Sequence, residues 1–397
     1  MTIFDRPEKT RIVDELDATD RLGEFVRELG GTRALLVSSP GLVNAGHVAR
    51  AEAALRRAGV AFASFTEVCE NPTTDDVDRC LEAARAFGPD LFVGFGGGSA
   101  IDTAKGANFL LCCGGRMRDY WGSDKATAPL LPLLAVPTTA GTGSEVQSYA
   151  LVAEAQTQRK MACGDPDAAP RMAVLDASLS VTQPPRVTIC TGLDAIGHAV
   201  ETCVTKARTE TSSAYSTEAF ARAVRAFPAV LERPRDLGAR AEMLRAATLA
   251  GLAIEHSMLG GAHALANPLT QHHGLPHGQA VATMLPFVVE LNAQDAASAE
   301  RYAELARHAS LVSAGSSTEE GVRALCAVLR RFLTLGDLPQ SLAGLALAEA
   351  DLERLAAGAA EQWTGGFNPR SLGVADFRGV LERASAASGA STGASDR

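Results

Sequence analysis

The residues best suited to chemistry are an aspartate and several histidines in the second half of the sequence. Asp194 and His198 lie four positions apart in TGLDAIGHAVET, so on a helix they share one face and can bind one ion. Five of the eight histidines fall in this segment and in GGAHALANPLTQHHGLPHGQA. One carboxylate and two or three imidazoles suit iron(II) or zinc and leave a position for a substrate. The pattern predicts a divalent metal site at Asp194 and His198 with histidines drawn from His263, His272, His273 and His277.

A glycine-rich turn in the first half predicts an anion site. In LFVGFGGGSAIDTAK, an apolar strand runs into glycines that let backbone N–H groups approach a phosphate at the start of a helix. Ser99 and Asp102 are spaced as a helix capping box. The strict GxGxxG pattern fails because Ser99 stands where the third glycine belongs, and the Walker spacing is absent, so this is neither common phosphate loop.

A second loop, in LLAVPTTAGTGSEV, follows another buried strand. Its hydroxyl groups are suited to hydrogen-bonding a ribose, a phosphate or an amide, and they come from Thr138, Thr139, Thr142 and Ser144. Loops that follow neighbouring parallel strands line the same edge of a sheet. The two loops together therefore predict a nucleotide site.

The elements that must position these residues differ between the two halves. From Arg33 to about Asp176, short aliphatic runs alternate with helical stretches, which indicates βαβ units and a mostly parallel sheet. Beyond the proline-rich stretch at 182–187, a helical pattern dominates. We expect an α/β dinucleotide-binding domain at 1–186, an all-helical metal-binding domain at 187–383 and a disordered tail at 384–397. The ligand site is expected in the cleft between the domains.

Composition excludes several classes of function. The chain has 397 residues, of which 46% are hydrophobic, and a net charge of −9 without a clustered basic patch, so no nucleic-acid partner is expected. No stretch reaches the roughly 18 apolar residues of a membrane span, which makes the cytoplasm the expected location. The eight cysteines are scattered without a CxxC pair, which is typical of reduced thiols.

GGGSAIDTAK, PTTAGTGSEV, GLDAIGHAVE and GAHAxxxPL…PHG occur in an order and at intervals that resemble the iron-containing alcohol dehydrogenase family. The resemblance runs from about Arg33 to a closing FNPRSL segment at 367–372. It implies a dehydroquinate synthase-like fold with a metal between an α/β and a helical domain. The implied metal ligands are Asp194, His198, His263 and His277. The implied ion is iron(II), with zinc as the alternative, because this donor set suits both.

The resemblance also implies the contacts of an NAD or NADP cofactor. The residues implied to hold the pyrophosphate are Gly96, Gly97, Gly98 and Ser99. The residues implied to lie along the phosphates and the nicotinamide are Thr138, Thr139 and Thr142. Lys160, in QRKMA, is implied to reach the nicotinamide ribose, and Asp102 either contacts the adenine-side phosphate region or only caps its helix.

The sequence departs from the family pattern at two positions. Many relatives carry a proton-relaying histidine four residues after the first C-terminal metal histidine, where this chain has Asn267. An amide does not shuttle protons, so either water relays them, with His272 or His273 nearby, or the pocket accepts a different substrate. We interpret His272 and His273 as exposed loop residues. NAD-preferring relatives often end the first strand with Asp, whereas Ser39 follows ALLVS here, so we expect NADP to be tolerated.

These observations predict a metal-dependent, NAD(P)-linked alcohol dehydrogenase or aldehyde reductase. Hydride would pass between the nicotinamide and a small alcohol or aldehyde whose oxygen the metal polarises. The alternatives are a metal-independent reductase resembling maleylacetate reductase, a lyase resembling dehydroquinate synthase, and a nucleotide-sensing protein without catalysis. The resemblance also implies a homodimer or a larger homo-oligomer. The individual alcohol is not determined by these motifs.

Overall fold

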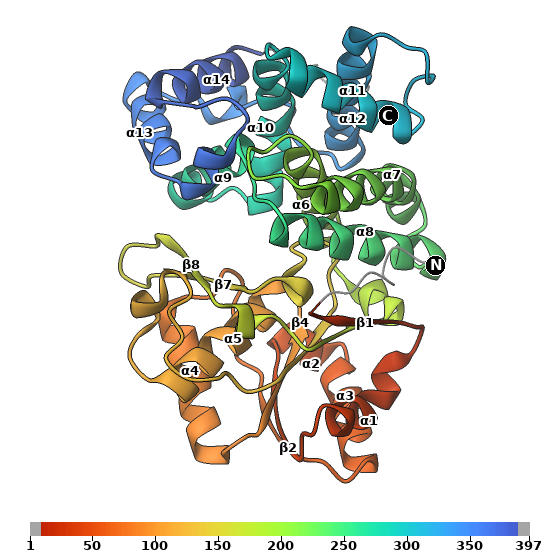
Figure 1. Ribbon diagram of the computed structural model, residues 1–397, viewed down its shortest axis with the longest axis vertical. Coiled ribbons are helices and arrows are strands. Elements are labelled where there is room, and N and C mark those ends of the chain that lie inside the picture. Colours follow the sequence, from red (N-terminus) through yellow and green to blue (C-terminus); the bar gives the residue numbers. More distant parts are fainter. Residues whose placement is uncertain (1–8, 388–397) are drawn as a thin grey trace, which may run out of the picture.

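The structure, a computed structural model that describes residues 9–387, has two halves stacked along its long axis (Figure 1). The last strand of the first half ends at Leu175, and the long helices of the second half begin at Pro185. The expected fold class, a parallel α/β half followed by a helical half, is confirmed. Within the described residues, no helix is long and apolar enough to cross a membrane.

A six-stranded parallel sheet forms the centre of the first half. Its order is β1-β9-β6-β4-β2-β3, with β1 (Arg11–Asp14), β2 (Arg33–Val37), β3 (Ala61–Phe65), β4 (Leu91–Gly96), β6 (Leu133–Pro137) and β9 (Met172–Leu175). From β2 the chain adds β3 on one side, then returns to add β4, β6 and β9 on the other. Ligands of such sheets bind outside the carboxyl ends of the strands where the direction reverses, here between β2 and β4.

Helices cover both faces of this sheet because alternate strand residues point to opposite sides. Leu36 of β2 packs with α1 (Leu22–Glu28) and α3 (His47–Arg57), whereas Leu35 packs with α4 (Thr74–Phe87) and α5 (Gly98–Cys113). The short helix α2 (Pro40–Asn44) follows β2. Strands covered on both faces read as continuous apolar runs, which is why the sequence revealed them.

Four strands lie outside the alternating runs from which the parallel sheet is predicted. The edge strand β1 pairs with β9, and it precedes Arg33, where the alternation of apolar runs and helical stretches begins. A separate three-stranded sheet contains β5 (Gly122–Ser123), β7 (Tyr149–Ala153) and β8 (Lys160–Gly164). These strands are short and mostly pair with segments distant in sequence, so their local pattern is weak. Lys160 begins β8, and the QRKMA segment that resembles the family is thus partly a strand.

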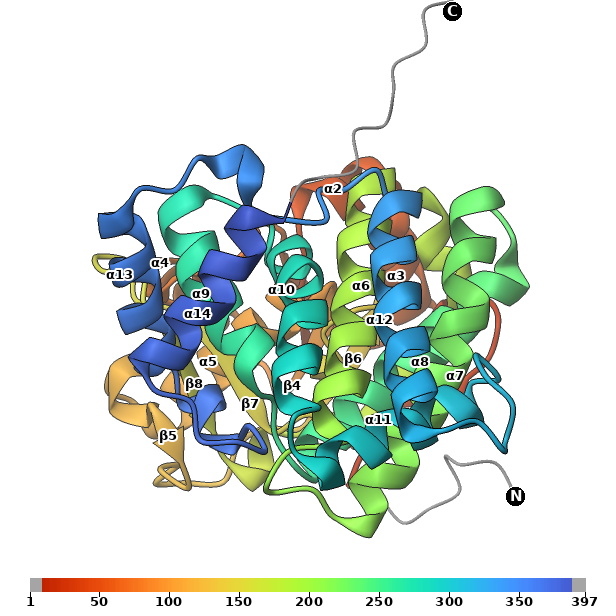
Figure 2. The same ribbon diagram turned by 90° about the horizontal axis from the view of Figure 1, so that it is seen from above.

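The second half consists of helices around one apolar core. They are α6 (Pro185–Thr202), α7 (Glu210–Glu232), α8 (Leu237–Glu255), α9 (Gly261–His273), α10 (His277–Asn292), α11 (Ala296–His308), α12 (Thr318–Leu335), α13 (Glu349–Ala360) and α14 (Val374–Ala386). Figure 2 shows α6 and α10 side by side at its centre. Helix α14 continues past residue 384 into the expected tail, whose residues 388–397 lie outside the described part.

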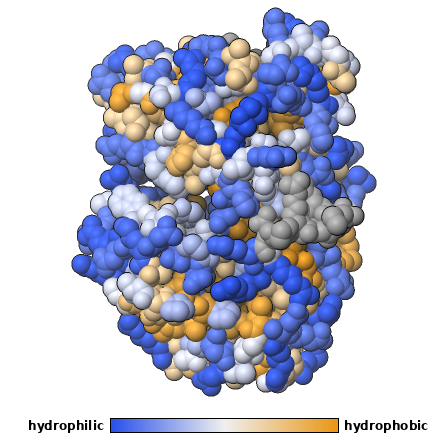
Figure 3. Space-filling view, in the orientation of Figure 1, coloured by the Kyte–Doolittle hydropathy of each residue, from blue (hydrophilic) through white to orange (hydrophobic). Residues whose placement is uncertain are grey.

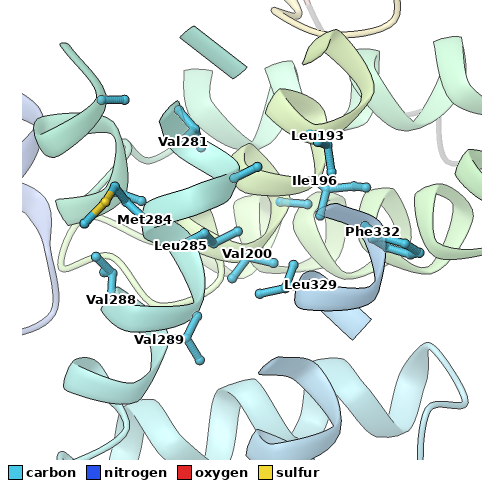
Figure 4. Packing of buried hydrophobic residues seen from close by; sticks show 14 of the residues in the cluster. Leu193, Ile196, Val200, Val281, Met284, Leu285, Val288, Val289, Leu329 and Phe332 are labelled. Carbon is cyan, nitrogen blue, oxygen red and sulfur yellow. The ribbon is translucent and has the colours of Figure 1, made fainter. Parts of the chain in front are cut away.

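Helix α6 separates packing from chemistry by its helical period. Leu193, Ile196 and Val200 pack into the core against α10 and α12 (Figure 4). Asp194 and His198 are offset around the helix from these residues and form another stripe. Burial of Leu193, Ile196 and Val200 in the core therefore sets the direction in which Asp194 and His198 point.

Pro268, whose residue type is expected to limit the helix that carries His263, lies inside helix α9. The helix begins at Gly261, contains Pro268 within it and ends at Gly274, which has a φ of 66°. Pro268 is buried and faces Gly358 of α13, so tertiary packing compensates for the hydrogen bond that proline cannot donate. His272 and His273 consequently lie in the last helical turn, and the loop assigned to them was wrong.

Candidate metal centre and cofactor loops

The four side chains implied as metal ligands meet around one carboxylate oxygen. Asp194 Oδ1 lies 3.5 Å from His198 Nε2, 3.4 Å from His263 Nε2 and 3.8 Å from His277 Nε2. The rings of His198 and His263 stack with centroids 4.8 Å apart. Ligand atoms of Asp194, His263 and His277 all lie within 4.8 Å of one another, a spacing that one ion can bridge. Helices α6, α9 and α10 thus bring together residues as far apart in the sequence as Asp194 and His277, which are 83 positions apart.

The buried polar atoms of this cluster fit a cation. Among residues 9–387, Asp194 Oδ1 and His263 Nε2 have no hydrogen-bond partner. Leaving such atoms unpaired costs free energy, which a shared metal ion would remove. The side chain of His277 is 25% exposed, against 7% or less for the other three, so the cluster opens on the His277 side.

The electrostatics favour positive charge at the centre of the cluster. Burial lowers the pKa of His198 to about 4 and that of His277 to about 3, which keeps these imidazoles neutral and able to donate lone pairs. Burial also opposes charge on Asp194, but the surrounding histidines, His198 first, lower its pKa well below the usual range. Despite burial, Glu201 and Asp194 raise the pKa of His263 to about 9.

The two predicted cofactor loops face each other at the carboxyl ends of β4 and β6. The N–H of Thr138 donates to the carbonyl of Gly96 at 3.0 Å. A Cβ at residue 97 would lie 3.2 Å from the Thr139 hydroxyl, and one at residue 98 would lie 2.5 Å from that of Thr142. Only glycine fits residue 98 without displacing Thr142.

The capping box expected at Ser99 and Asp102 is wrong. Helix α5 begins at Gly98 with Gly97 as its N-cap, and no side chain caps it. Because glycine can start the helix at residue 98, Ser99 is already a helical residue. The first N–H groups of this helix remain available for an anion. Asp102 is buried within α5 with an unpartnered Oδ1, and burial raises its pKa to about 6.

Lys160, Ser39 and Asn267 lie near these groups. The charge of Lys160 lowers the pKa of both Asp102 and His277, so this lysine is within electrostatic range of helix α5 and of the metal cluster. Ser39 lies two residues after the end of β2, at the point where the strand order reverses. The Asn267 amide, one turn after His263, donates to Gln362 Oε1 at 2.8 Å. His272 is exposed, and neither it nor His273 belongs to the metal cluster.

Sequence reasoning missed the residues that join the loops to the rest of the protein. Lys105 is 1% exposed and its Nζ donates to three carbonyls, those of Ser144, Gln147 and Tyr149, at 2.6–2.9 Å. Thr248 of α8 donates to Glu145 Oε1 at 2.7 Å. Lys105 and Glu145 are in the quoted motifs, but a side chain's burial and partners cannot be read from a motif.

A third missed residue, Glu201, lies beside the metal cluster. Its Oε2 is 2.5 Å from His263 Nδ1, and it follows His198 by three residues on α6. The spacing of Asp194, His198 and Glu201 along one helix face was the signal that could have revealed it.

The two halves meet beside the loops, and the surface between them is hollowed on one side. Gly143 packs so closely on Gly251 of α8 that a Cβ on either residue would lie within 2.7 Å of the other's backbone. Figure 3 shows the surface hollowed between the halves at the left of the view. On that side, Gln271 donates to the carbonyl of Thr157, and Tyr149 contacts Trp363 at a ring distance of 5.9 Å. The threonine loop that contains Gly143 therefore lies at the junction of the two halves.

Comparison with known proteins agrees with this arrangement. Residues 9–177 match the family described as "Iron-containing alcohol dehydrogenase", and residues 188–385 match "Fe-containing alcohol dehydrogenase family, C-terminal". The chain is 30% identical to the NAD-dependent methanol dehydrogenase of Bacillus methanolicus over 92% of its own length and 96% of the relative's. It is 32% identical to the 1,3-propanediol dehydrogenase of Klebsiella pneumoniae, covering 93% and 95%.

Among solved structures, that of a 1,3-propanediol oxidoreductase superposes with a TM-score of 0.90 at 31% identity, covering 94% of this chain and 97% of that one. The motifs, the fold and the meeting of Asp194 with three histidines agree with the family that the sequence resembles. The chain belongs to the iron-containing alcohol dehydrogenase family.

Proposed function

We propose that this protein is a metal-dependent, NAD(P)-linked dehydrogenase that interconverts a small alcohol and its aldehyde. The observation that carries the proposal is the convergence of three imidazole Nε2 atoms within 3.8 Å of Asp194 Oδ1, next to the loops that follow β4 and β6. Gly141 of the threonine loop packs directly on Thr191 of α6, so the proposed cofactor site adjoins the helix that carries Asp194.

The residues have separate roles in this proposal. Asp194, His198, His263 and His277 would hold the divalent ion, with iron(II) and zinc both suited to the donor set. The ion would supply a Lewis acid for the substrate oxygen. The open N-terminus of α5 at Gly97 and Gly98 would receive the pyrophosphate. Lys160 would orient the nicotinamide ribose between the two sites.

The protein's own contribution is to position the reactants and exclude water. Asp194, His198 and His263 are each at most 5% exposed, so substrate approaches from the His277 side. Fixing the nicotinamide and the substrate carbon in contact lowers the entropic cost of hydride transfer. Asn267 cannot relay a proton as a histidine would, so the proton of the alcohol is expected to leave through water.

Incubation with small aldehydes and each reduced cofactor tests the proposal. We expect NADH and NADPH both to be oxidised, with kcat/KM values within about tenfold of each other. The reason is that Ser39 places no carboxylate against the 2′-phosphate of NADPH. One such unfavourable contact would cost about 1.4 kcal/mol or more, which corresponds to a tenfold difference. The absorbance of the nicotinamide at 340 nm measures the rate. Protein that contains no divalent metal and oxidises neither cofactor with any aldehyde would refute the function.

Replacing Asn267 by histidine tests the remaining departure from the family pattern. The change removes the hydrogen bond to Gln362 and places a titratable group one turn from His263. We expect kcat to acquire a pH dependence between about pH 6 and 7, the ordinary range for histidine. Asn267→Gln, which keeps an amide, is the matched control. An unchanged rate, pH profile and aldehyde preference in the histidine variant would show that this position does not affect the reaction.

The proposal extends to the organisation of the chain. We assign the cofactor domain to residues 1–186 and the metal domain to 187–383, and the family matches divide the chain in nearly the same place. A homodimer or larger homo-oligomer, which light scattering would detect, and a cytoplasmic location remain predictions from the sequence.

A further inference from the structure

The start of helix α9 is stabilised by residues far away in the sequence. Its N-cap is Gly260, and no side chain of the local sequence caps it. The N–H groups of Gly260 and Ala262 donate to Glu201 at 3.0 and 2.7 Å. The N–H of Gly261 donates to Asn368 Oδ1 at 3.2 Å. The position of this helix end therefore depends on α6 and on the closing segment of the chain.

Glu201 makes one contact that Asn368 does not. Besides the two backbone N–H groups, its carboxylate contacts His263 Nδ1 at 2.5 Å. Glu201 is 3% exposed, and its carboxylate faces the His263 edge opposite to Asp194, which lies 3.4 Å from Nε2. Two carboxylates thus face the two nitrogens of one imidazole.

This arrangement determines which nitrogen of His263 can bind a metal. When Nδ1–H donates to a carboxylate, Nε2 carries the lone pair and the ring cannot rotate without losing that bond. A carboxylate partner also makes the imidazole a stronger electron donor. The charges of Glu201 and Asp194 together equal that of one divalent cation, so the loaded site would be neutral in a buried environment where net charge is costly.

We propose that Glu201 is a positioning residue of the metal centre, which orients His263, selects its Nε2 as the ligand atom and balances the charge of the cation. The inference rests on the proposed metal site. It separates two functions at the α9 start. Glu201 contacts both the helix end and His263, whereas Asn368 contacts the helix end, Asn292 and Arg370 but no residue of the metal cluster.

Metal binding by the intact protein tests the proposal. Apoprotein of the parent, Glu201→Gln and Asn368→Ala is titrated with Zn²⁺ in competition with a chromophoric chelator, and with Co²⁺ to record the absorption spectrum of the bound ion. We expect Glu201→Gln to weaken Zn²⁺ binding by about 10- to 100-fold and to alter the Co²⁺ spectrum. Asn368→Ala should lower the Tm of the apoprotein and leave the Zn²⁺ affinity within about threefold of the parent, since it touches no ligand.

A double mutant shows whether Glu201 acts through His263. If it does, Glu201→Gln adds little further loss of affinity in a His263→Ala background. Glu201→Asp, which keeps the charge and shortens the reach, should also bind Zn²⁺ more weakly, and it replaces the glutamine variant if that one does not fold. Parent-like Zn²⁺ affinity in either folded Glu201 variant would overturn the inference. Failure of the parent to bind Zn²⁺ or Co²⁺ would instead overturn the proposed metal site itself.

Discussion

Replacing Asp194 by asparagine is expected to lower kcat/KM for alcohol and aldehyde by at least about a thousandfold. The change keeps the size of the side chain and removes the one negative charge that the three imidazoles surround. A Lewis acid contributes several kcal/mol to the stabilisation of developing charge, and about 4 kcal/mol corresponds to a thousandfold in rate. The measurement is steady-state kinetics together with metal content by elemental analysis.

The variant must be shown to fold before the loss is assigned to chemistry. The circular dichroism spectrum should match the parent's, because the apolar stripe of α6 that packs into the core is unchanged. Asp337→Asn, at an exposed position after α12, is the matched control and should retain parental activity and metal content. A chelator should abolish parental activity, and Fe²⁺ or Zn²⁺ should restore it. Full activity in metal-free protein would contradict the mechanism.

The second large effect is expected at the cofactor loop. Gly98→Ala should raise the KM for NADH and NADPH by about a hundredfold, equivalent to about 2.7 kcal/mol. A methyl group there would lie 2.5 Å from the Thr142 hydroxyl, next to the first N–H groups of α5 to which we assign the pyrophosphate under the proposed function. Cofactor affinity is measured by titrating NADH fluorescence, which separates binding from turnover.

Two further variants separate the clash with Thr142 from the loss of space for the phosphate. Gly379→Ala adds the same methyl group where no atom lies within 4 Å, and it should bind cofactor like the parent. Gly98→Ala combined with Thr142→Ala removes the two closest contacts, leaves the Cβ of residue 142 at 3.0 Å and keeps the added methyl group, so its cofactor affinity should remain low. Parental affinity in the single variant would show that this turn does not receive the pyrophosphate.

Several features of the protein could be predicted from the sequence because they depend on local chemistry. Apolar runs that alternate with helical stretches indicated the parallel sheet, and their disappearance after residue 182 indicated the helical half. The four-residue spacing of Asp194 and His198 placed them on one helix face. The grouping with His263 and His277 came from the family resemblance, and the structure brings these residues together.

Other expectations failed where neighbouring elements outweighed the local signal. Ser99 and Asp102 have the spacing of a capping box, but the glycines before them let α5 start two residues earlier, at Gly98. Pro268 usually limits a helix, yet α9 continues through it because the residue packs against α13. The histidines at 272 and 273 are helical for the same reason.

The sequence by itself therefore determined the two-part architecture, because alternating and helical patterns are local. Its motifs indicated the family, and the choice of His263 and His277 as partners of Asp194 came from that resemblance. Only the tertiary structure decided which buried atoms are left without partners and which are paired. The approach of Glu201 to His263, the anchoring of the threonine loop by Lys105 and the opening of the cluster at His277 all join segments far apart in the chain. Such contacts depend on how the core packs. Burial removes water as a hydrogen-bond partner, so a buried polar group must find its partner among residues that the fold brings close.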